Sequence, residues 1–217
     1  MIIVLTGRAH GENRRILKQL FGLRYEVFIR GGGWVAPARA GTDRYDDRDA
    51  VYFVDLDAEN QIQAGVRITP TDKSSLISDY FPQLMEMEET KRHSKIYELN
   101  RHVLAPSVDY FQGRVSVARL LVAIVEWSLQ QQITHLQAMI DDAAAEDYLK
   151  ISPLLRQLGA PVGYGGGRGT PGGGELIGIR WPVNPSLLEE VRKYCRVTEA
   201  QAVLAADDIL QNARPKN

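Results

Sequence analysis

The sequence predicts an α/β (α+β) fold in which helices cover a mixed sheet. Two observations predict it. Short apolar runs closed by turn residues dominate the middle of the chain, and segments with helical apolar spacing alternate with them. No internal repeat and no linker divides the 217 residues, which suffice for one sizeable core. We therefore expect a single domain over residues 1–217.

Strands are predicted where apolar residues alternate or run together before a turn residue. Asp57–Asn60 supplies the turn between the second and third strands, and Pro70 ends the third. In that third strand, alternation places Arg67 on the face opposite its aliphatic residues, which are Ile62, Ala64, Val66 and Ile68. The predicted strands are Met1–Leu5, Val51–Leu56, Ile62–Thr69, Ile96–Leu104, Ile133–Ile140 and Leu176–Trp181.

Helices are predicted where apolar residues recur every three or four positions. The clearest is Val115–Gln132, which carries one broad apolar stripe. The others are Glu12–Phe28, Glu146–Leu158, Pro185–Tyr194 and Glu199–Ala213. Residues 214–217 are expected to form a frayed tail.

Two segments are predicted to be loops because of their glycine and proline content. Residues 29–49 form a long loop with three successive glycines beside Trp34, and long loops in compact domains are functional or disordered. We interpret this segment as a substrate-covering loop, with a structural role for Trp34 as the alternative. The second segment, Gly163–Gly174, lacks the strand–turn–helix setting of a phosphate-binding loop and is expected to be mobile.

Composition excludes several classes of protein. The 26 basic and 27 acidic side chains give a net charge of -1, which disfavours nucleic-acid binding through general electrostatics. The single cysteine, Cys195, allows no internal disulfide, and with four scattered histidines we expect no metal site. No apolar run is long enough to span a membrane, and the N-terminus does not resemble a signal peptide. We expect a cytoplasmic protein without nucleic-acid or membrane partners, and its oligomeric state stays open.

Charged residues in unusual places are the candidates for a functional site. Four carboxylates between Asp43 and Asp49 repel each other unless cations offset them. This segment is therefore either a solvated acidic loop or a site for a positively charged ligand. Arg67 stands in the middle of a strand, where a buried guanidinium must be paired. Exposure at a strand end is the alternative for Arg67.

The predicted strand Ile96–Leu104 carries an unusual polar face. A period of two places Glu98, Asn100 and His102 together. Arg101 then lies on the opposite face, unless a bulge redirects it. The pattern indicates either an inner strand with a polar active face or an edge strand with a solvated one.

An ordered series of motifs runs through the first half of the chain. Its segments are Arg24 to Phe28, Trp34, Asp43-Arg-Tyr-Asp46, Gly65-Val-Arg67-Ile-Thr-Pro-Thr71, Phe81-Pro-x-Leu84 and Glu98-Leu-Asn-Arg101. This series resembles the motifs of the acyl-homoserine lactone synthases, the LuxI-type autoinducer synthases of quorum-sensing bacteria. Their Glu-x-Ser-Arg-Phe motif differs here, because Asn100 and His102 replace the serine and the phenylalanine. The resemblance implies the fold of the GCN5-related N-acetyltransferases, a mixed twisted sheet flanked by helices.

The resemblance also implies a reaction. The α-amino group of S-adenosylmethionine attacks the thioester carbonyl of an acyl donor, which is an acyl-carrier protein or an acyl-CoA. The methionine carboxylate then displaces methylthioadenosine and closes the lactone, so S-adenosylmethionine is a substrate and no cofactor is expected. An ammonium group must lose a proton before it can attack, and Glu98 is the candidate base, directly or through a water.

By the same resemblance, Glu98, Asp46 and Arg101 are the catalytic residues. The residues expected to bind S-adenosylmethionine are Arg24, Phe28, Trp34, Asp43, Asp46, Arg67 and Arg101. The expected acyl pocket consists of Asn100, His102, Trp127, Leu136, Met139 and Ile140. A docking patch for an acidic carrier protein, or simply a set of solvated side chains, is formed by Arg114, Arg119, Lys150 and Arg156.

Two other functions stay open. A GCN5-like N-acyltransferase could acylate a different amine, but the phosphate-binding turn of that class matches Phe111–Ser116 poorly. A non-catalytic sensor module for an adenosyl ligand would not need Glu98 on an active face.

Overall fold

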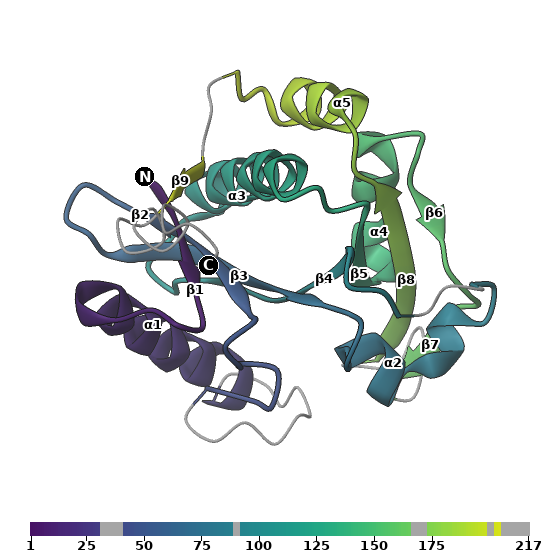
Figure 1. Cartoon of the computed structure of the whole chain (residues 1–217), viewed down its shortest axis with the longest axis horizontal. Helices are drawn as coiled ribbons and strands as arrows, with labels where there is room; N and C mark the ends of the chain where they lie inside the picture. The colour runs from purple at the N-terminus through teal and green to yellow at the C-terminus, as the bar shows by residue number, and fades with distance from the viewer. Residues whose placement is uncertain (31–40, 89–91, 166–172, 199–201, 205–217) are drawn as a thin grey trace, which may run out of the picture. The chain divides into compact units, whose positions relative to one another are not determined.

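The computed structural model describes residues 1–30, 41–88, 92–165, 173–198 and 202–204 (Figure 1). These residues form two compact units. Of the described residues, the first unit contains those within 1–68 and 101–126 together with 202–204, and the second contains those within 69–100 and 127–198. Two strands and one helix pass from one unit into the other, so neither unit is a continuous stretch of chain.

The first unit is built on a mixed sheet. Its elements are β1 (Ile2–Thr6), α1 (Gly11–Arg24), the π-helical turn η1 (Tyr25–Arg30), β2 (Val51–Leu56), most of β3 (Ile62–Pro70), the second part of β4 (Ile96–Leu104), most of α3 (Tyr110–Gln130) and β9 (Ala202–Leu204). Strand β1 pairs antiparallel with β2 and parallel with β9, and β2 pairs antiparallel with β3. The sheet is therefore mixed, as the sequence predicts.

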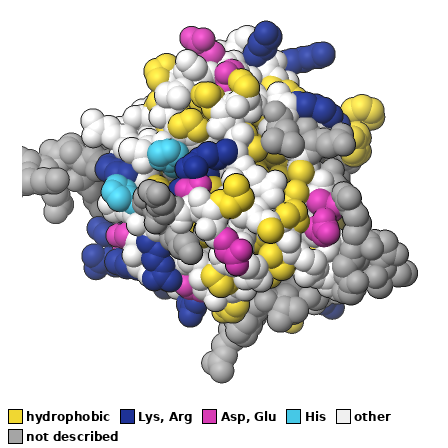
Figure 2. All heavy atoms as spheres, turned by 90° about the vertical axis from the view of Figure 1, so that its right-hand side faces the viewer, with side chains coloured by type: hydrophobic (Ala, Val, Ile, Leu, Met, Phe, Trp, Pro, Cys, Tyr) yellow, Lys and Arg dark blue, Asp and Glu magenta, His cyan; other side chains and the backbone are white. Residues whose placement is uncertain are grey.

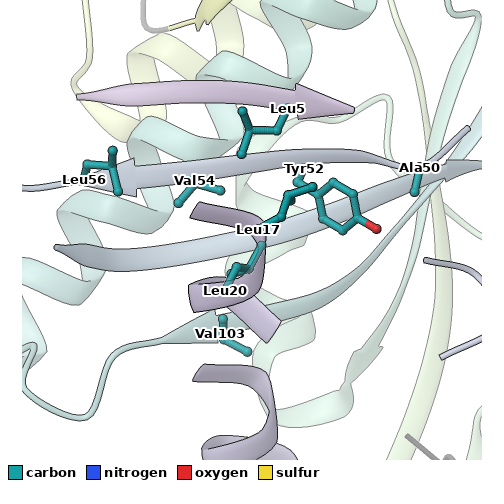
Figure 3. Packing of buried hydrophobic residues seen from close by; sticks show 8 residues of the cluster. All are labelled: Leu5, Leu17, Leu20, Ala50, Tyr52, Val54, Leu56 and Val103. Carbon is teal, nitrogen blue, oxygen red and sulfur yellow. The ribbon is translucent and has the colours of Figure 1, made fainter. Parts of the chain in front are cut away.

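Helix α1 packs on one face of this sheet. Leu17 and Leu20 of α1 contact a buried cluster that includes Leu5, Tyr52 and Val54 (Figure 3). Gly65 of β3 makes this close approach possible, because a Cβ atom there would lie 2.4 Å from Leu20 Cδ1. The first glycine of the Gly-x-Arg motif is thus a packing requirement of α1.

Helix α3 covers the opposite face of the first unit's sheet (Figure 1). Asp55 of β2 faces α3 and binds Arg119 at 3.1 Å. The register of β2 and β3 shifts between Asp55 and Leu56. Ile62 therefore packs with the α1 cluster rather than on the face predicted for it.

The second unit also contains a mixed sheet. Strand β4 pairs parallel with β5, and β8 pairs antiparallel with β5, β6 and β7. Its elements, besides the first part of β4 and the end of α3, are α2 (Leu76–Tyr80), η2 (Pro82–Met85), β5 (His135–Asp141), α4 (Asp142–Ile151), β6 (Arg156–Gln157), β7 (Val162–Tyr164), β8 (Gly174–Pro182) and α5 (Pro185–Cys195).

Three predicted helices differ from the structure. The predicted helix Glu146–Leu158 is α4, which begins earlier and ends at Ile151, because Pro153 disfavours a helical Ser152. Helix α3 begins at Tyr110 rather than at Val115. The C-terminal prediction is wrong at residues 202–204, which form strand β9, since pairing with β1 overrides a helical pattern. The remainder of that predicted helix and the tail 214–217 lie outside the described residues.

The two predicted loops are only partly visible. Residues 25–30 continue α1 as a π-helical turn, so residues 29 and 30 are helical and not part of a loop. Residues 41–49 form turns, as expected for a loop. In the second segment, 162–164 is strand β7. Residues 31–40, with Trp34, and 166–172 lie outside the described residues.

Two features complete the description of the fold. The α/β prediction is confirmed, because each unit combines a mixed sheet with helices. In the part of the chain that the structure describes, no helix has the length and apolar character needed to cross a membrane.

Candidate active site

Three arginines and two aspartates of the first unit form a buried cluster. Arg24 donates bidentately to Asp46, with N–O distances of 2.7 and 2.9 Å. Arg67 binds both carboxylates, at 2.5 Å from Asp43 and 2.7 Å from Asp46. The Nε of Arg101 donates to Asp43 at 2.8 Å. All five side chains are at most 8% exposed, so these are buried and not surface ion pairs.

Backbone geometry brings Asp43 and Asp46 to the arginines. Gly41 has a φ of 78°, and a Cβ atom there would lie 1.8 Å from the carbonyl oxygen of Phe21, so only glycine fits. The turn that follows is stabilised by hydrogen bonds between its own residues. The Asp43 N–H donates to Asp46 Oδ2 at 2.7 Å, and the Tyr45 N–H donates to Asp43 Oδ1 at 3.0 Å.

Arg101 joins the cluster because the strand is irregular at this residue. Its φ is 55°, a left-handed conformation that is uncommon outside glycine. The simple alternation of β4 therefore stops at Arg101, as the sequence allowed for a bulge. A strained residue that is held by a buried ion pair is typical of a functional site.

Aromatic rings surround the cluster. The Tyr52 hydroxyl donates to Asp46 Oδ1 at 3.0 Å. The ring of Phe28 lies 5.6 Å from the Arg101 guanidinium, and the ring of Tyr45 lies 5.6 Å from that of Arg67. Rings at this distance stabilise the cations and exclude water from them.

The electrostatics of this cluster favour an anionic ligand group. Burial acts to raise the pKa of Asp43, but the hydrogen bonds and charges of Arg67 and Arg101 outweigh it and lower that pKa to about 2. Both aspartates are therefore ionised. Since three guanidinium groups face only two carboxylates, the cluster has excess positive charge and suits a substrate carboxylate.

Glu98, the expected base, lies in the second unit and is 1% exposed. Its Oε1 accepts from the Leu76 N–H at 2.9 Å and from Asn100 Nδ2 at 3.2 Å. Its Oε2 accepts from the Ile77 N–H and from Gln137 Nε2, both at 3.3 Å. Burial raises the pKa of the Glu98 carboxyl, although the hydrogen bonds it accepts oppose that rise.

A polar network continues from Glu98, and the sequence analysis missed it. Arg180 donates to Gln137 Oε1 at 2.7 Å and to Glu88 Oε2 at 2.6 Å. Arg156 also donates to Glu88, at 2.5 and 3.0 Å. Part of the signal was present in the sequence, because Arg180 stands within the predicted strand Leu176–Trp181, whose other residues are apolar or glycine.

The residues expected to line the acyl pocket are divided between the two faces of β5. Met139 shares a face with Gln137 and packs against the buried cluster Ile77, Leu84, Met85, Leu158 and Leu176. Leu136 and Ile140 point to the other face. Trp127 belongs with them, because its ring packs edge-to-face against that of Tyr97, the register partner of Leu136.

The two remaining acyl-pocket candidates lie on β4. Asn100 donates to Glu98, as described above, whereas His102 is exposed. The structure therefore places only Asn100 and Met139, of the six candidates, on the same face as Glu98 in the second unit.

The four basic residues expected to dock a carrier protein are not all available. Arg119 is paired with Asp55, and Arg156 with Glu88. On the face that Figure 2 shows, basic side chains lie among acidic, histidine and apolar ones. Among the described residues, no group of histidine, cysteine and acidic side chains is arranged to hold a metal ion.

Comparison with solved structures identifies the fold. The chain matches a protein assigned as an N-acetyltransferase from Lactobacillus plantarum with a TM-score of 0.56, at 17% identity over 85% of this chain and 98% of that one. The match is higher, with a TM-score of 0.79, to BjaI, a CoA-dependent acyl-homoserine lactone synthase. That similarity covers 94% of this chain and 93% of BjaI at 21% identity. The fold is thus N-acetyltransferase-like.

Sequence comparison then identifies the family. The profile of the autoinducer synthase family matches residues 9–169. The isovaleryl-homoserine lactone synthase of Bradyrhizobium diazoefficiens is 28% identical over 68% of this chain and 67% of its own length. The acyl-homoserine-lactone synthase of Agrobacterium fabrum is 25% identical over 88% of this chain and 90% of its own. The chain therefore belongs to the autoinducer synthase family, and by class it is an acyl-homoserine-lactone synthase, an acyltransferase.

The family assignment confirms the resemblance seen in the sequence. It does not favour a GCN5-like transferase for another amine or a sensor module. The individual roles of the site residues are a separate matter and rest on the geometry given above.

Proposed function

We propose that this enzyme acylates S-adenosylmethionine with an acyl-CoA and closes the product to an acyl-homoserine lactone, a quorum-sensing signal. The observation that carries the proposal is the convergence of separate motifs. Arg24, Asp43, Asp46, Arg67 and Arg101 come from different parts of the chain and form one buried cluster. A family match alone would not require that.

The charge cluster is the proposed site for the methionine part of S-adenosylmethionine. Its excess positive charge suits the substrate carboxylate, and Arg101, at the cluster's edge with 8% exposure, is the proposed contact. Phe28 lies beside Arg101 and would flank the adenosyl group. Asp43 and Asp46 fix the arginines, because both carboxylates are already bound by them.

Glu98 is the proposed general base. The substrate ammonium must lose a proton before its nitrogen can attack, and a carboxylate whose pKa is raised by burial is a stronger base than an exposed one. The amine then attacks the thioester carbonyl, and backbone N–H groups would stabilise the oxyanion. The intermediate expels the coenzyme A thiolate, which leaves an amide.

Lactone formation needs mainly positioning. The carboxylate of the acylated substrate attacks its own γ-carbon, the C–S bond breaks, and methylthioadenosine leaves as a neutral thioether. Because the thioester and the sulfonium are both already activated, we expect no cofactor.

Two observations support acyl-CoA rather than a carrier protein as the donor. BjaI, a CoA-dependent synthase, has been solved with S-adenosylmethionine and isopentyl-CoA, and its fold covers 94% of this chain. In addition, Arg119 and Arg156 of the expected docking patch are engaged in ion pairs with buried carboxylates.

The test has two stages. Extracts of a heterologous host that makes no such signal, expressing this chain, are searched by mass spectrometry for acyl-homoserine lactones. Purified enzyme is then given S-adenosylmethionine with isovaleryl-CoA, or with the same acyl group on a carrier protein. We expect lactone and methylthioadenosine in equal amounts from the CoA donor. Acyl amide without lactone would contradict the proposal, and turnover with the carrier alone would correct the donor.

A further inference from the structure

One buried hydroxyl group of β3 makes no hydrogen bond within the protein. Thr69 is 4% exposed, and among the described residues no group binds its Oγ1. Thr71, two residues further along the chain, differs from it, because its Oγ1 accepts from the His93 N–H and donates to the His93 carbonyl oxygen, both at 3.1 Å. A buried hydroxyl without a partner destabilises the folded protein, and such groups are rare in native structures.

Strand pairing places Thr69 opposite Glu98, and both residues belong to the second unit. Strands β3 and β4 are neighbours in the sheet, and hydrogen bonds at their two ends show that they run antiparallel. At one of these ends the Thr71 N–H donates to the Ile96 carbonyl oxygen at 3.0 Å, so these two residues are opposite each other. Two residues along each strand, Thr69 is opposite Glu98. Residues opposite each other point to the same face, with Cβ atoms about 4.5–5.5 Å apart.

The groups that hydrogen-bond the Glu98 carboxylate are all neutral. They are two backbone N–H groups, two side-chain amides and one hydroxyl, which belong to Leu76, Ile77, Asn100, Gln137 and Ser75. An ionised carboxylate with neutral partners attracts a cation. Because Thr69 and Glu98 point to the same face, a small cationic group beside Glu98 would meet a hydroxyl oxygen as well as the carboxylate.

An ammonium group fits this pair of side chains. It has N–H donors and no acceptor, whereas the Glu98 carboxylate and the Thr69 hydroxyl oxygen both accept. After one proton has moved to Glu98, the amine keeps two N–H bonds and one lone pair. A hydrogen bond from one of these N–H groups to Thr69 Oγ1 would fix the direction of the lone pair, and attack on a second bound group requires such an orientation.

We propose that the Thr69 hydroxyl binds the α-amino group of S-adenosylmethionine beside Glu98 and orients it for attack on the thioester. The inference rests on the proposed function and on Glu98 as the base. It adds a substrate contact that neither the resemblance nor the charge cluster assigns. The proton passes from the substrate nitrogen to a Glu98 oxygen, and the hydroxyl itself neither gains nor loses a proton.

A second buried hydroxyl of the same unit provides a matched control. Ser128 of α3 is fully buried, and its Oγ also has no hydrogen-bond partner in the described part of the chain. Thr69→Val and Ser128→Ala each remove such a hydroxyl without breaking a hydrogen bond. Both variants should therefore raise the melting temperature, by about 2–4 °C. Only Thr69→Val should change substrate binding.

Calorimetric titration of the purified enzyme tests the contact. Thr69→Val should bind S-adenosylmethionine about 10- to 100-fold more weakly than wild type, which corresponds to the loss of one hydrogen bond to a charged group. Decarboxylated S-adenosylmethionine keeps the aliphatic amino group, so its binding should be weakened by the same factor. Methylthioadenosine lacks that group and should bind both proteins equally. Ser128→Ala should bind all three ligands as wild type does.

A further pair of variants keeps the test decisive. Thr69→Ser retains a hydroxyl and should bind S-adenosylmethionine, and turn over, within a few-fold of wild type. If Thr69→Val does not fold, Thr69→Ala removes the same hydroxyl and is compared with Thr69→Ser instead.

The outcomes separate this inference from the proposed function. Equal affinity of Thr69→Val and wild type for S-adenosylmethionine overturns the contact. Weaker binding of S-adenosylmethionine with unchanged binding of the decarboxylated ligand overturns its assignment to the amino group. A lowered melting temperature with equal losses for all three ligands would show a structural role for the hydroxyl and also overturns the inference. Failure of the wild-type enzyme to make lactone would instead overturn the proposed function, whatever the Thr69 variants bind.

Discussion

Asp43 and Asp46 in the first unit and Glu98 in the second are buried carboxylates that are held in opposite ways. In the first, Asp43 and Asp46 are surrounded by three arginines, and their pKa values are lowered although burial alone would raise them. In the second, Glu98 is equally buried but accepts hydrogen bonds from neutral groups, so burial dominates and its pKa is raised. All of these carboxylates are buried, so the charge of their partners determines whether the pKa is lowered or raised.

This difference separates binding from proton transfer. A carboxylate that is paired with guanidinium groups keeps those groups in position. Its lowered pKa makes it too weak a base to remove a proton from an ammonium group. A carboxylate with a raised pKa can do so. Asp46, which the resemblance also implied as catalytic, belongs to the fixed cluster, and Glu98 remains the proposed general base.

The largest expected effect is that of Glu98→Gln. Loss of a general base lowers kcat by about 10²–10⁴-fold. The amide replaces an acceptor by a donor beside groups that already donate, so some destabilisation is also expected. Steady-state kinetics and a thermal melt at the same pH separate the two effects. If a folded Glu98→Gln variant turns over within a few-fold of wild type, Glu98 is not the general base, and the proposed division between binding and proton transfer fails.

Arg67→Met should destabilise the buried charge cluster of the first unit. Arg67 is fully buried between Asp43 and Asp46, and removing one partner of a buried ion pair costs about 3–5 kcal/mol. Urea unfolding measures the loss. Among variants that remain folded, Asp46→Asn should raise the KM for S-adenosylmethionine more than that for the acyl donor. A change confined to the acyl-donor KM would contradict the assignment of this cluster.

The pH dependence of stability should have opposite signs in the two regions. The pKa of Asp43 is about 2 in the folded protein and 3.8 in the reference state, so its contribution of about 2 kcal/mol is present above pH 4 and is lost as pH falls toward 2. The pKa of Glu98 is raised, so its ionisation reduces stability as pH rises through the folded value.

Unfolding free energies of the two variants across acidic pH test this contrast. Relative to wild type, Asp43→Asn should lose most stability near neutral pH and progressively less as the pH falls. Glu98→Gln should show the reverse trend. If the unfolding free energies of the two variants changed with pH in the same way, the charge of the hydrogen-bond partners would not determine the direction of the pKa shift.

Much of the fold follows from sequence pattern, because burial imposes it. Strands β2 and β4 have the predicted boundaries, since apolar runs and following turn residues mark them. Helix α4 and strand β9 were predicted less well, because Pro153 and pairing with a distant strand decide them. Local periodicity carries no information on such long-range pairing.

The site was predictable in composition but not in geometry. The motifs named Arg24, Asp43, Asp46, Arg67 and Arg101, and the structure brings all of them together. The sequence does not reveal that Arg101 adopts a positive φ, or that the backbone N–H groups of Leu76 and Ile77 hydrogen-bond the Glu98 carboxylate. The acyl-pocket candidates on β5 were grouped by position along the chain, and the sequence did not show which face of the strand each side chain takes.

The smallest expected effect concerns acyl choice and depends on that division of faces. Met139 shares a face of β5 with Gln137, the partner of Glu98, so we expect it, and not Ile140 on the other face, to limit the acyl chain. One methylene in an apolar pocket changes discrimination by about 1–3 kcal/mol, so Met139→Ala should shift the kcat/KM profile of a series of acyl-CoA donors toward longer chains by a graded amount. Ile140→Ala is the matched control: it removes a similar volume on the opposite face and should lower the melting temperature without moving the profile. If the two variants change the profile equally, the face of β5 that carries Met139 does not determine the preference for acyl-chain length, and residues elsewhere in the molecule do.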